Sequence, residues 1–473
     1  MLWLSIDRNK NIPLIRQIYE QIRLQIIQGE MYQGEKLPST RELAETLKVS
    51  RNVVLEAYDQ LSAEGYMTSL MGSGSYVADG ACLKQFRLEQ PRQAEPVYFL
   101  PTQPQNLIDF QFGVPALDLF PGKKWGQIYR SVCNSSPVSI FGYGEPEGRE
   151  ELRQVLAHYL TRNRGVYCEP DQIIITTGAM QAIFIIANVL LSSKDTIVSE
   201  DPLNRNIRQI FTDTGAKILP IPVDEQGIQT NLVQSTKDLR LIYITPSHQF
   251  PLGSTLPIQR RIELVETARK TGCYILEDNY DNEFRFEGTP VSSLQGLEPE
   301  LVFYVGTFSK ILSPALRIGY MVVPRKLINS CRRYKDLLDH HSPSLNQLVL
   351  TQFIEQGYFE RHIAKMKKVY RKRQETIIKS LTELFPGEYK VSGHSTGLHL
   401  IVEFDHIEFN DEVNKRLKEA GIVVYPVEMY AINKGRFKNR IMLGYGNVNE
   451  EQIVEGMKRM KECLDIIRTS YSR

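Results

Sequence analysis

One lysine of this chain stands among residues that could hold a phosphate-bearing aldehyde. Hydroxyl side chains at Thr307 and Ser309 come just before Lys310, and Arg317 follows in the same segment, residues 306–320. A lysine amine with a depressed pKa can condense with an aldehyde as an imine. The hydroxyls and the guanidinium can supply hydrogen bonds and charge to a dianionic phosphate. The segment therefore indicates imine chemistry at Lys310, with a phosphate held beside it.

Asp278, which precedes Lys310 in the sequence, is predicted to lie where its carboxylate could pair with a ring nitrogen of a ligand. The apolar run Tyr274–Leu276 predicts a buried strand, so Asp278 should lie just beyond its carboxyl end. Ligands of α/β sheets bind at the carboxyl ends of the strands. An ionised carboxylate there would keep a pyridine nitrogen protonated and let the ring withdraw electrons. The neighbours Glu277 and Asp281 are expected to be structural.

A third segment, residues 177–181, offers further ligands for a phosphate. Gly178, Ala179 and Met180 stand where a strand is predicted to turn into a helix. The first amides of a helix are free and lie at the positive end of the helix dipole. We therefore expect the backbone of this turn to receive the phosphate.

A different chemistry is indicated near the N-terminus. Ser39 followed by Glu42 has the spacing of a capping box and predicts a short helix that ends near Leu47. Ser50 offers an N-cap for a following helix, which Gly65 ends. Two short helices joined by a tight turn form a helix-turn-helix, and the second helix of such a motif enters the major groove of DNA.

The first turns of these two helices supply the candidate DNA contacts. Ser50, Arg51 and Asn52 should meet base edges, whereas Arg41 should lie near phosphates. An amphipathic helix is predicted over residues 13–27, before the motif. After the motif, residues 66–70 and 75–77 can pair as strands across Gly72-Ser73-Gly74, because glycine permits the positive φ of a tight turn. Residues 1–78 are therefore predicted to form a winged helix-turn-helix.

This predicted winged domain carries no excess of positive charge. Residues 1–78 contain eight Lys plus Arg against nine Asp plus Glu. The net charge of this domain therefore gives no driving force for DNA binding through the release of counterions from the phosphates. The placement of Arg41, Lys48 and Arg51 supports DNA binding. The alternative is a winged helix that binds protein.

The rest of the chain predicts a linker and a larger α/β domain. Residues 79–105 are proline-rich and polar without periodicity, as in a semi-extended linker. Residues 106–473 form the second domain, with a large part over about 106–330 and a small part over about 331–473. Short apolar runs alternate with helical stretches in the large part, which predicts a parallel or mostly parallel sheet covered by helices. These runs are residues 173–175, 196–198, 218–219, 241–244, 274–276, 302–305 and 321–323.

The small part is predicted to be α+β. A long helical stretch is expected over residues 326–384, with strands near 400–402 and 441–443. No segment of the chain has the basic-then-apolar pattern of a leader or an apolar run long enough to cross a bilayer, so a cytoplasmic protein is expected.

Composition bounds the remaining possibilities. The chain has 473 residues, of which 42% are hydrophobic and 24% charged, and a formal net charge of +2. A chain of this length is expected to form at least two globular domains. Its six cysteines are scattered without a CxxC pair, which argues against a zinc site and a disulfide framework. No metal site is predicted.

Taken together, these segments resemble a known kind of regulator. Residues 37–74, with the pattern described above, resemble the GntR family of winged regulators. The segment around Lys310 resembles the lysine segment of type I fold aminotransferases. The loop over residues 245–253 resembles the MocR/GabR regulators, in which a GntR-type domain is fused to an aminotransferase-like domain. The likeness covers essentially the whole chain, and it implies pyridoxal 5'-phosphate as the cofactor.

The resemblance implies roles for individual residues of the cofactor site. Lys310 would form the Schiff base, Asp278 would pair with the pyridine nitrogen, and Tyr280 would bond to the ring hydroxyl. Tyr143 would reach the phosphate of a partner subunit, which requires a dimer. His248 would touch the cofactor ring or else be a packed loop histidine.

The resemblance also implies ligands for an effector and for DNA. Arg440 would hold a carboxylate, unless it is an ordinary solvent-facing arginine. Relatives form head-to-tail dimers, and a dimer suits a paired DNA site. The DNA contacts, with those carried over from the GntR family, are Ser39, Arg41, Ser50, Arg51, Asn52 and Ser73.

Three positions depart from the aminotransferase pattern. Leu203 and Asn204 stand where family members commonly have glycine and a tyrosine beside the cofactor, and Phe250 stands where an asparagine is usual. Arg205 either replaces a nearby carboxylate-binding arginine or faces solvent. These departures argue against efficient transamination.

The sequence thus predicts a transcription regulator that binds promoter DNA and responds to pyridoxal 5'-phosphate, or to a small amine or amino acid that forms an imine with it. The alternative is a pyridoxal phosphate-dependent aminotransferase whose winged domain is a tether or vestige. Lys310, Asp278, Tyr280 and Arg317 together would suffice to begin transamination.

Overall fold

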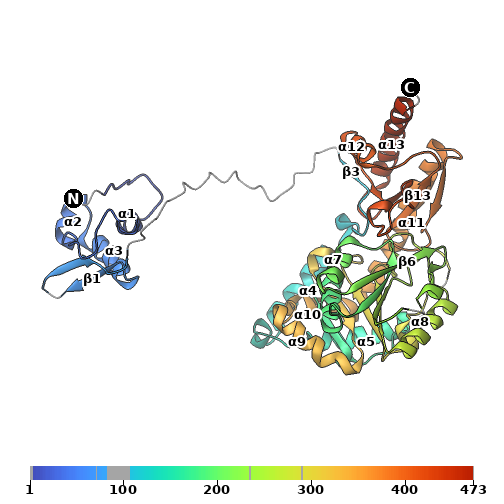
Figure 1. The fold of residues 1–473 in the computed structure, drawn as a ribbon, viewed down its shortest axis with the longest axis horizontal. Coiled ribbons are helices and arrows are strands. Elements are labelled where there is room, and N and C mark those ends of the chain that lie inside the picture. Colours follow the sequence, from blue (N-terminus) through green and yellow to red (C-terminus); the bar gives the residue numbers. More distant parts are fainter. Residues whose placement is uncertain (1–3, 71, 82–106, 234–235, 289–290, 472–473) are drawn as a thin grey trace. The chain divides into compact units, whose positions relative to one another are not determined.

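The computed structural model describes residues 4–70, 72–81, 107–233, 236–288 and 291–471. It divides into two compact units, Met1–Pro101 and Thr102–Arg473 (Figure 1). Most of the predicted linker lies outside the described residues, as does Cys82. The other five cysteines are free. No helix in the described ranges is both long and apolar enough to span a membrane.

The N-terminal unit is a three-helix domain with a hairpin. Its elements are α1 (Leu14–Ile27), α2 (Thr40–Leu47), α3 (Arg51–Ala63), β1 (Met67–Leu70) and β2 (Gly74–Val77). The predicted capping box is confirmed, because Ser39 Oγ accepts from the Glu42 amide and the Glu42 carboxylate accepts from the Ser39 amide. The hairpin is antiparallel, with Met67 opposite Val77, which confirms the predicted wing.

Apolar side chains at helical spacing hold this unit together. Ile18 and Ile22 of α1 and Val54 and Leu61 of α3 are fully buried in one core. Ser50 is the N-cap residue of α3, but its side chain makes no capping hydrogen bond in the described structure.

A mixed eight-stranded sheet forms the centre of the C-terminal unit. Four of its seven pairings are parallel, and β11 is antiparallel to both of its neighbours. In spatial order the strands are β4 (Ile173–Thr176), β11 (Gly319–Val322), β10 (Val302–Thr307), β9 (Tyr274–Asn279), β8 (Leu239–Ile244), β5 (Thr196–Asp201), β6 (Lys217–Asp224) and β7 (Gly227–Ile228). All seven apolar runs of the sequence lie in or overlap these strands.

Helices cover both faces of the sheet. The helices of the large part are α4 (Gly122–Ser135), α5 (Glu150–Arg164), α6 (Ala179–Leu190), α7 (Arg205–Asp213) and α8 (Ile258–Thr271). Successive side chains of a strand point to opposite faces. Ile275 of β9 accordingly packs in the core that contains Leu264 of α8, and Leu276 packs in the core that contains Ile183 of α6. This two-sided burial explains why the strands are apolar throughout.

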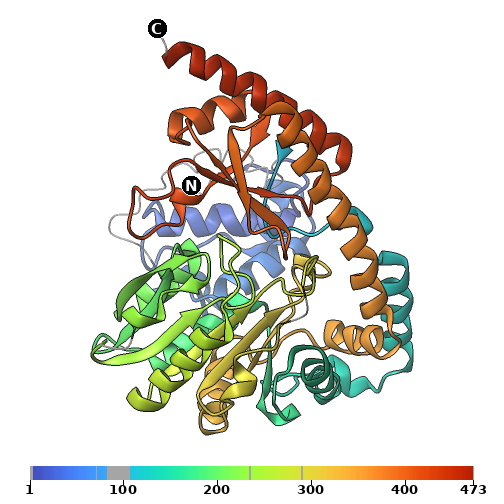
Figure 2. The same cartoon turned by 90° about the vertical axis from the view of Figure 1, so that its right-hand side faces the viewer.

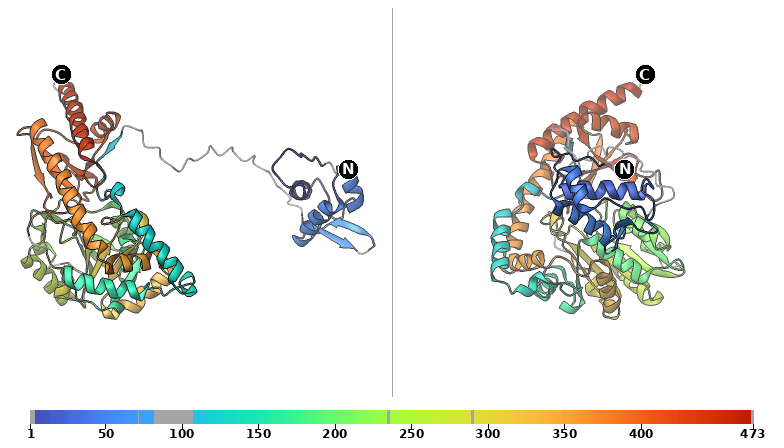
Figure 3. Two further views of the ribbon diagram at one scale, coloured as in Figure 1. Left: turned by 180° about the vertical axis from the view of Figure 1, so that it is seen from behind. Right: turned by 90° about the vertical axis from the view of Figure 1, so that its left-hand side faces the viewer.

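The predicted helical stretch over residues 326–384 is wrong in its continuity. It consists of α9 (Ile328–Asp339), α10 (Ser344–Glu355) and α11 (Tyr358–Leu384). His340 has a left-handed φ of 57°, and Pro343 has no amide hydrogen to continue a helix. Gly357, with φ 69°, separates the second helix from the third. Figure 3 shows α10 running beside α4, against which it packs.

The small part carries a second sheet, in the order β12-β13-β16-β15. Its remaining elements are β12 (Tyr389–Ser392), β13 (His399–Phe404), α12 (Asp411–Glu419), β14 (Ile422–Val423), β15 (Tyr425–Pro426), β16 (Arg440–Gly444) and α13 (Glu450–Tyr471). In Figure 2, α13 lies along α11 on one side of this sheet. The strand that follows the linker, β3 (Ile108–Asp109), pairs with β14.

The topology gathers polar residues at one edge of the large sheet. Strands β4, β5, β8, β9 and β10 all end at this edge. Since β11 runs the other way, its first residue, Gly319, lies between Thr307 of β10 and Thr176 of β4. The segments that follow these strand ends surround the candidate site.

Candidate functional site

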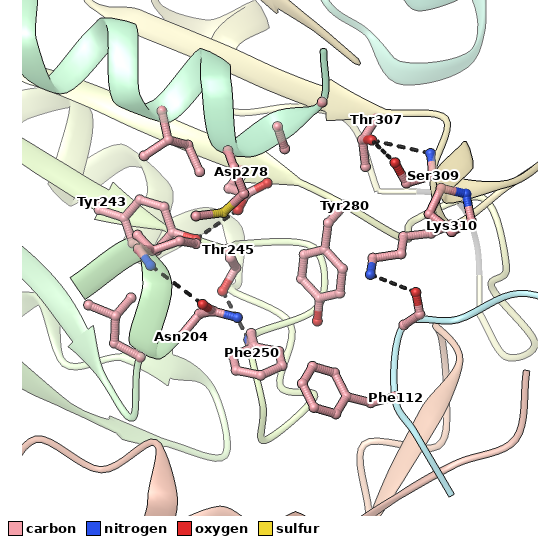
Figure 4. A pocket seen from close by; sticks show the side chains of 18 of the residues that line it. Phe112, Asn204, Tyr243, Thr245, Phe250, Asp278, Tyr280, Thr307, Ser309 and Lys310 are labelled. Carbon is pink, nitrogen blue, oxygen red and sulfur yellow. Dashed lines mark hydrogen bonds between the residues drawn. The ribbon is translucent and has the colours of Figure 1, made fainter. Parts of the chain in front are cut away.

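A cavity of about 250 Å³ opens at the carboxyl ends of the strands. Figure 4 shows it from close by. Nine of the eleven residues predicted to bind the cofactor line it: Lys310, Asp278, Tyr280, Arg317, Thr307, Ser309, Gly178, Ala179 and Met180. The fold therefore brings together segments that lie far apart in the sequence.

Lys310 follows β10 and points across the cavity to the chain that leaves β3. Its Nζ donates a hydrogen bond to the carbonyl oxygen of Gly113 at 2.6 Å. Gly113 has a φ of +66°, and a Cβ there would lie 2.5 Å from Lys310 Nζ. Burial lowers the pKa of the Lys310 ammonium, although the carboxylates of Asp281 and Asp278 oppose this effect. A larger fraction of neutral amine makes Lys310 a better nucleophile.

Asp278 has one occupied and one free carboxylate oxygen. Its Oδ2 accepts a hydrogen bond of 2.8 Å from the hydroxyl of Tyr243, while Oδ1 is buried without a partner among the described residues. Burial raises the pKa of Asp278 to about 6, against the opposing effects of the Tyr243 hydrogen bond and the charge of Lys310. A buried oxygen without a partner is costly unless a ligand donates to it. A protonated ring nitrogen would be such a donor.

The other end of the cavity suits an anion. Helix α6 begins at Ala179, directly after Gly178, and Thr307 Oγ1 donates to Ser309 Oγ at 3.1 Å. Arg317 lines the same cavity and has a left-handed φ of 52°, which is uncommon for a residue with a side chain. The first amides of a helix, two hydroxyls and a guanidinium together form a typical phosphate-binding arrangement.

Close packing fixes this anion-binding end. A Cβ at Gly319 would lie 2.7 Å from the backbone of Gly178, so only glycine lets β11 approach the start of α6 so closely. The shape of the anion-binding end therefore depends on close backbone contact between β11 and the start of α6.

Tyr280 and His248 form a stacked pair at the cavity wall. Their ring centroids are 5.9 Å apart, and the Tyr280 hydroxyl lies 3.2 Å from His248 Nδ1. The same nitrogen lies 2.9 Å from Asp281 Oδ2. His248 is not among the described residues that line the cavity, whereas Tyr280 is. In the structure His248 is a buried loop residue that contacts the cavity wall through Tyr280.

His248, Asp281 and His399 form a buried group whose ligand-type atoms lie within 4.8 Å of one another. Their hydrogen bonds are made within the protein: His248 Nδ1 to Asp281, and His399 Nε2 to the carbonyl oxygen of Pro251. Burial and the neighbouring His248 lower the pKa of His399 to about 4. His399 is therefore a neutral ring at pH 7.

Three further predicted ligands lie outside this cavity. Tyr143 is 89% exposed and lies beside the rings of His340 and His341. Arg205 is exposed at the first position of α7. Arg440 Nη2 pairs with Glu403 at 2.9 Å, and Arg440 lines a different hollow. The structure thus brings neither of the two predicted carboxylate ligands to the cavity.

Sequence reasoning missed several residues that line the cavity. Phe112 and Gly113 come from the chain after β3, Tyr243 from β8 and His399 from β13. Tyr243 stands in an apolar run and carried no signal apart from strand propensity. Leu203 and Asn204, noted above as departures from the aminotransferase pattern, also line the cavity. The side chain of Asn204 caps α7.

The predicted DNA contacts lie on the surface of the N-terminal unit. All six, Ser39, Arg41, Ser50, Arg51, Asn52 and Ser73, are exposed. Arg51 Nε donates to Thr40 Oγ1 at 3.3 Å, which ties the first turn of α3 to that of α2. Ser73 Oγ lies 2.8 Å from the hydroxyl of Tyr76 in the hairpin.

Comparison with known proteins identifies both units. Residues 14–77 match the model of bacterial regulatory proteins of the gntR family, and residues 115–460 match that of class I and II aminotransferases. The C-terminal unit is similar to the solved structure of LysN, an α-aminoadipate aminotransferase from Thermus thermophilus complexed with N-(5'-phosphopyridoxyl)-L-leucine. The identity is 25% and the TM-score 0.70, over 77% of this chain and 94% of that one.

Relatives with both units extend over nearly the whole chain. The chain is 34% identical to the uncharacterised HTH-type transcriptional regulator YdeL of Bacillus subtilis, over 98% of this chain and 99% of that protein. It is 32% identical to the "Probable rhizopine catabolism regulatory protein MocR" of Rhizobium meliloti, over 99% and 97% respectively. The chain therefore belongs to the MocR-type transcription regulators, which join a GntR-family helix-turn-helix domain to an aminotransferase-like domain.

Proposed function

We propose that this regulator binds pyridoxal 5'-phosphate covalently through Lys310 and couples the occupancy of that site to promoter binding. The N-terminal unit would hold DNA through its six exposed contact residues. The C-terminal unit would respond to the cofactor itself or to a small amine or amino acid that competes with Lys310 for the cofactor aldehyde.

The partnerless Oδ1 of Asp278 carries the cofactor part of the proposal. It lies in the same cavity as the Lys310 amine and the anion-binding turn at Gly178. A ligand with a basic ring nitrogen, an aldehyde and a phosphate would satisfy all three. When bound, the cofactor supplies an electron-withdrawing ring. Asp278 would hold the proton on its nitrogen, and Tyr280 would orient the ring.

A homodimer is part of this proposal. The exposed Tyr143 stands close in sequence to two exposed apolar side chains, Val138 (85%) and Phe141 (59%). A contiguous exposed apolar patch commonly marks a protein interface, and in this proposal these side chains contribute to one. A second copy, packed head to tail, would cover this surface and let Tyr143 reach the phosphate bound by its partner.

The test is a DNA-binding measurement on the full chain. Its affinity for the DNA upstream of its own gene is measured with the cofactor removed and then restored, at one salt concentration because phosphate contacts make affinity salt-dependent. We expect specific binding that changes with pyridoxal phosphate, and no such change in the Lys310→Ala variant. Specific binding that is lost neither by Arg51→Ala nor by Asn52→Ala would contradict the assigned DNA contacts.

An aminotransferase remains the second candidate, because Lys310, Asp278, Tyr280 and Arg317 share one cavity. The departures at Leu203, Asn204 and Phe250 argue against it. Sustained conversion of an amino acid and a keto acid at about 1 per second or faster, without specific DNA binding, would favour the enzyme.

A further inference from the structure

We infer that the effector of this regulator is a primary amine with an apolar or aromatic substituent and no carboxylate. This inference rests on the proposed function, because it concerns the ligand that exchanges with Lys310 on the bound cofactor. It narrows the class of ligand to one of those that the sequence left open.

The first argument is the charge of the cavity. Among the described residues that line it, the charged side chains are Asp278, Lys310 and Arg317, and the cofactor would occupy all three. His399 also lines the cavity, but its lowered pKa keeps it neutral at pH 7. A carboxylate brought into such a site would lose its hydration without gaining a cation, which is strongly unfavourable.

The second argument is the position of the two arginines that could have supplied that cation. Arg440 is engaged by Glu403, and its guanidinium lies 5.4 Å from the ring centroid of Phe437. Turning it toward the cavity would leave the partly buried Glu403 carboxylate without this partner. Arg205 is exposed at the start of α7, where its charge acts on the Tyr430 hydroxyl, and it is not among the described residues that line the cavity. Neither is arranged to receive a carboxylate in the cavity.

The third argument is the wall beside the reactive nitrogen. Gly113, which accepts the hydrogen bond from Lys310 Nζ, is preceded by Phe112. The ring of Phe112 lies 5.4 Å from that of Phe250, which in turn lies 6.2 Å from that of Tyr280. Figure 4 shows Phe112 and Phe250 side by side next to Tyr280. An amine held where Lys310 Nζ reacts would place its substituent against these rings, which favours apolar and aromatic groups.

The exchange needs no further reactant. The nitrogen of the amine forms a bond to the aldehyde carbon of the cofactor, and the bond from that carbon to Lys310 Nζ breaks. The two protons that the amine loses end on Lys310 Nζ, so that lysine leaves as a neutral amine. Nothing is oxidised or reduced.

A matched pair of ligands tests the inference. Phenethylamine and L-phenylalanine share the aromatic group and the reacting amine and differ by one carboxylate. The full chain, loaded with pyridoxal phosphate, is titrated with each, and the absorbance of the bound cofactor is followed. We expect half-saturation by phenethylamine at a concentration at least 10-fold below that for L-phenylalanine. Equal or tighter binding of L-phenylalanine, or no response to either ligand, would overturn the inference.

Variants distinguish the effect of a missing cation from the effect of the shape of the cavity. Asn204→Arg places a guanidinium in the cavity, and Asn204→Ala removes the same helix cap without adding charge. We expect only Asn204→Arg to strengthen L-phenylalanine binding, by about 10-fold or more. Arg440→Gln should leave both ligands unaffected. A loss of L-phenylalanine binding in Arg440→Gln would show that Arg440 reaches the site and would overturn the inference.

The experiment also distinguishes this inference from the proposed function. Loading with pyridoxal phosphate gives an absorbance band that should be absent in Lys310→Ala. If the wild-type chain gives no such Lys310-dependent band, the proposed cofactor site fails. If the band appears and the two ligands behave alike, only the assignment of ligand class fails.

Discussion

At the scale of single residues, Tyr243 would decide how Asp278 meets the ring nitrogen of the proposed cofactor. Its hydroxyl occupies Oδ2 and leaves Oδ1 for the ligand. We predict that Tyr243→Phe weakens pyridoxal phosphate binding by about tenfold, because a hydrogen bond to a charged group is lost. Cofactor titration of the full chain measures this. Tyr304→Phe, on β10 and equally buried, is the control and should bind the cofactor normally. Equal affinity of the Tyr243→Phe variant would rule out this positioning role.

A buried carboxyl of β5 gives a prediction about pH. Glu200 accepts from the backbone and the hydroxyl of Thr245, yet burial raises its pKa to about 7 from 4.5. The folded state therefore holds a proton that the unfolded state releases between pH 4.5 and 7, so the free energy of unfolding falls as pH rises through this range. Glu200→Gln mimics the protonated form.

We therefore expect Glu200→Gln to be more stable than the wild type at pH 8, by about 1–3 kcal/mol, with the difference vanishing near pH 4.5. Calorimetry of the full chain at several pH values measures it. Glu225→Gln, at an exposed position, should show no such dependence. A stability difference that does not vary with pH would contradict the raised pKa.

At the scale of elements, two serines in equivalent positions differ in what they do. Ser39 caps α2 through a reciprocal capping box, whereas the side chain of Ser50 makes no capping bond to α3. We predict that Ser39→Ala destabilises the N-terminal unit by about 1 kcal/mol, which lowers its melting temperature by about 4–8 °C. Ser50→Ala should change it by less than about 0.5 kcal/mol while weakening DNA binding. Thermal unfolding of the full chain measures both variants. Equal destabilisation by Ser39→Ala and Ser50→Ala would contradict the conclusion that only Ser39 caps its helix.

Elements were predictable from the sequence where one local pattern dominates. The apolar runs of the sheet, the capping box and the hairpin all lie where the sequence placed them. The break between α9 and α10 was missed, because apolar periodicity continues on both sides of it. The short β3, β14 and β15 carry only two residues each, too few for a period.

The same reasoning explains which site residues were missed. Lys310 and Asp278 have a chemistry that their types reveal. Gly113 and Tyr243 are defined by their partners, which lie 197 and 35 residues away in the chain. Arg440 was predicted as a carboxylate ligand from a family resemblance. Its pairing with Glu403 depends on the strand register between β13 and β16, which one sequence does not reveal.

At the scale of the whole molecule, the chain after the linker leads directly to a contact with Lys310, the proposed cofactor lysine. The first strand after the linker, β3, leads within a few residues to Gly113, whose carbonyl oxygen accepts the hydrogen bond from Lys310 Nζ. A covalent bond between Lys310 and a ligand removes that donor. The contact of this segment with Lys310 therefore depends on whether Lys310 is bound to a ligand.

Thermodynamic linkage makes this coupling measurable in both directions. If pyridoxal phosphate changes DNA affinity by some factor, specific DNA must change cofactor affinity by the same factor. We predict a factor of about 5–150, measured by titrating the full chain with each ligand in the presence and absence of the other at one salt concentration. Gly113→Ala places a Cβ 2.5 Å from Lys310 Nζ, so it should reduce both the cofactor affinity and this factor. Unequal factors in the two directions would show that one of the two titrations had not reached equilibrium. A factor of one in both would mean that the two units function independently.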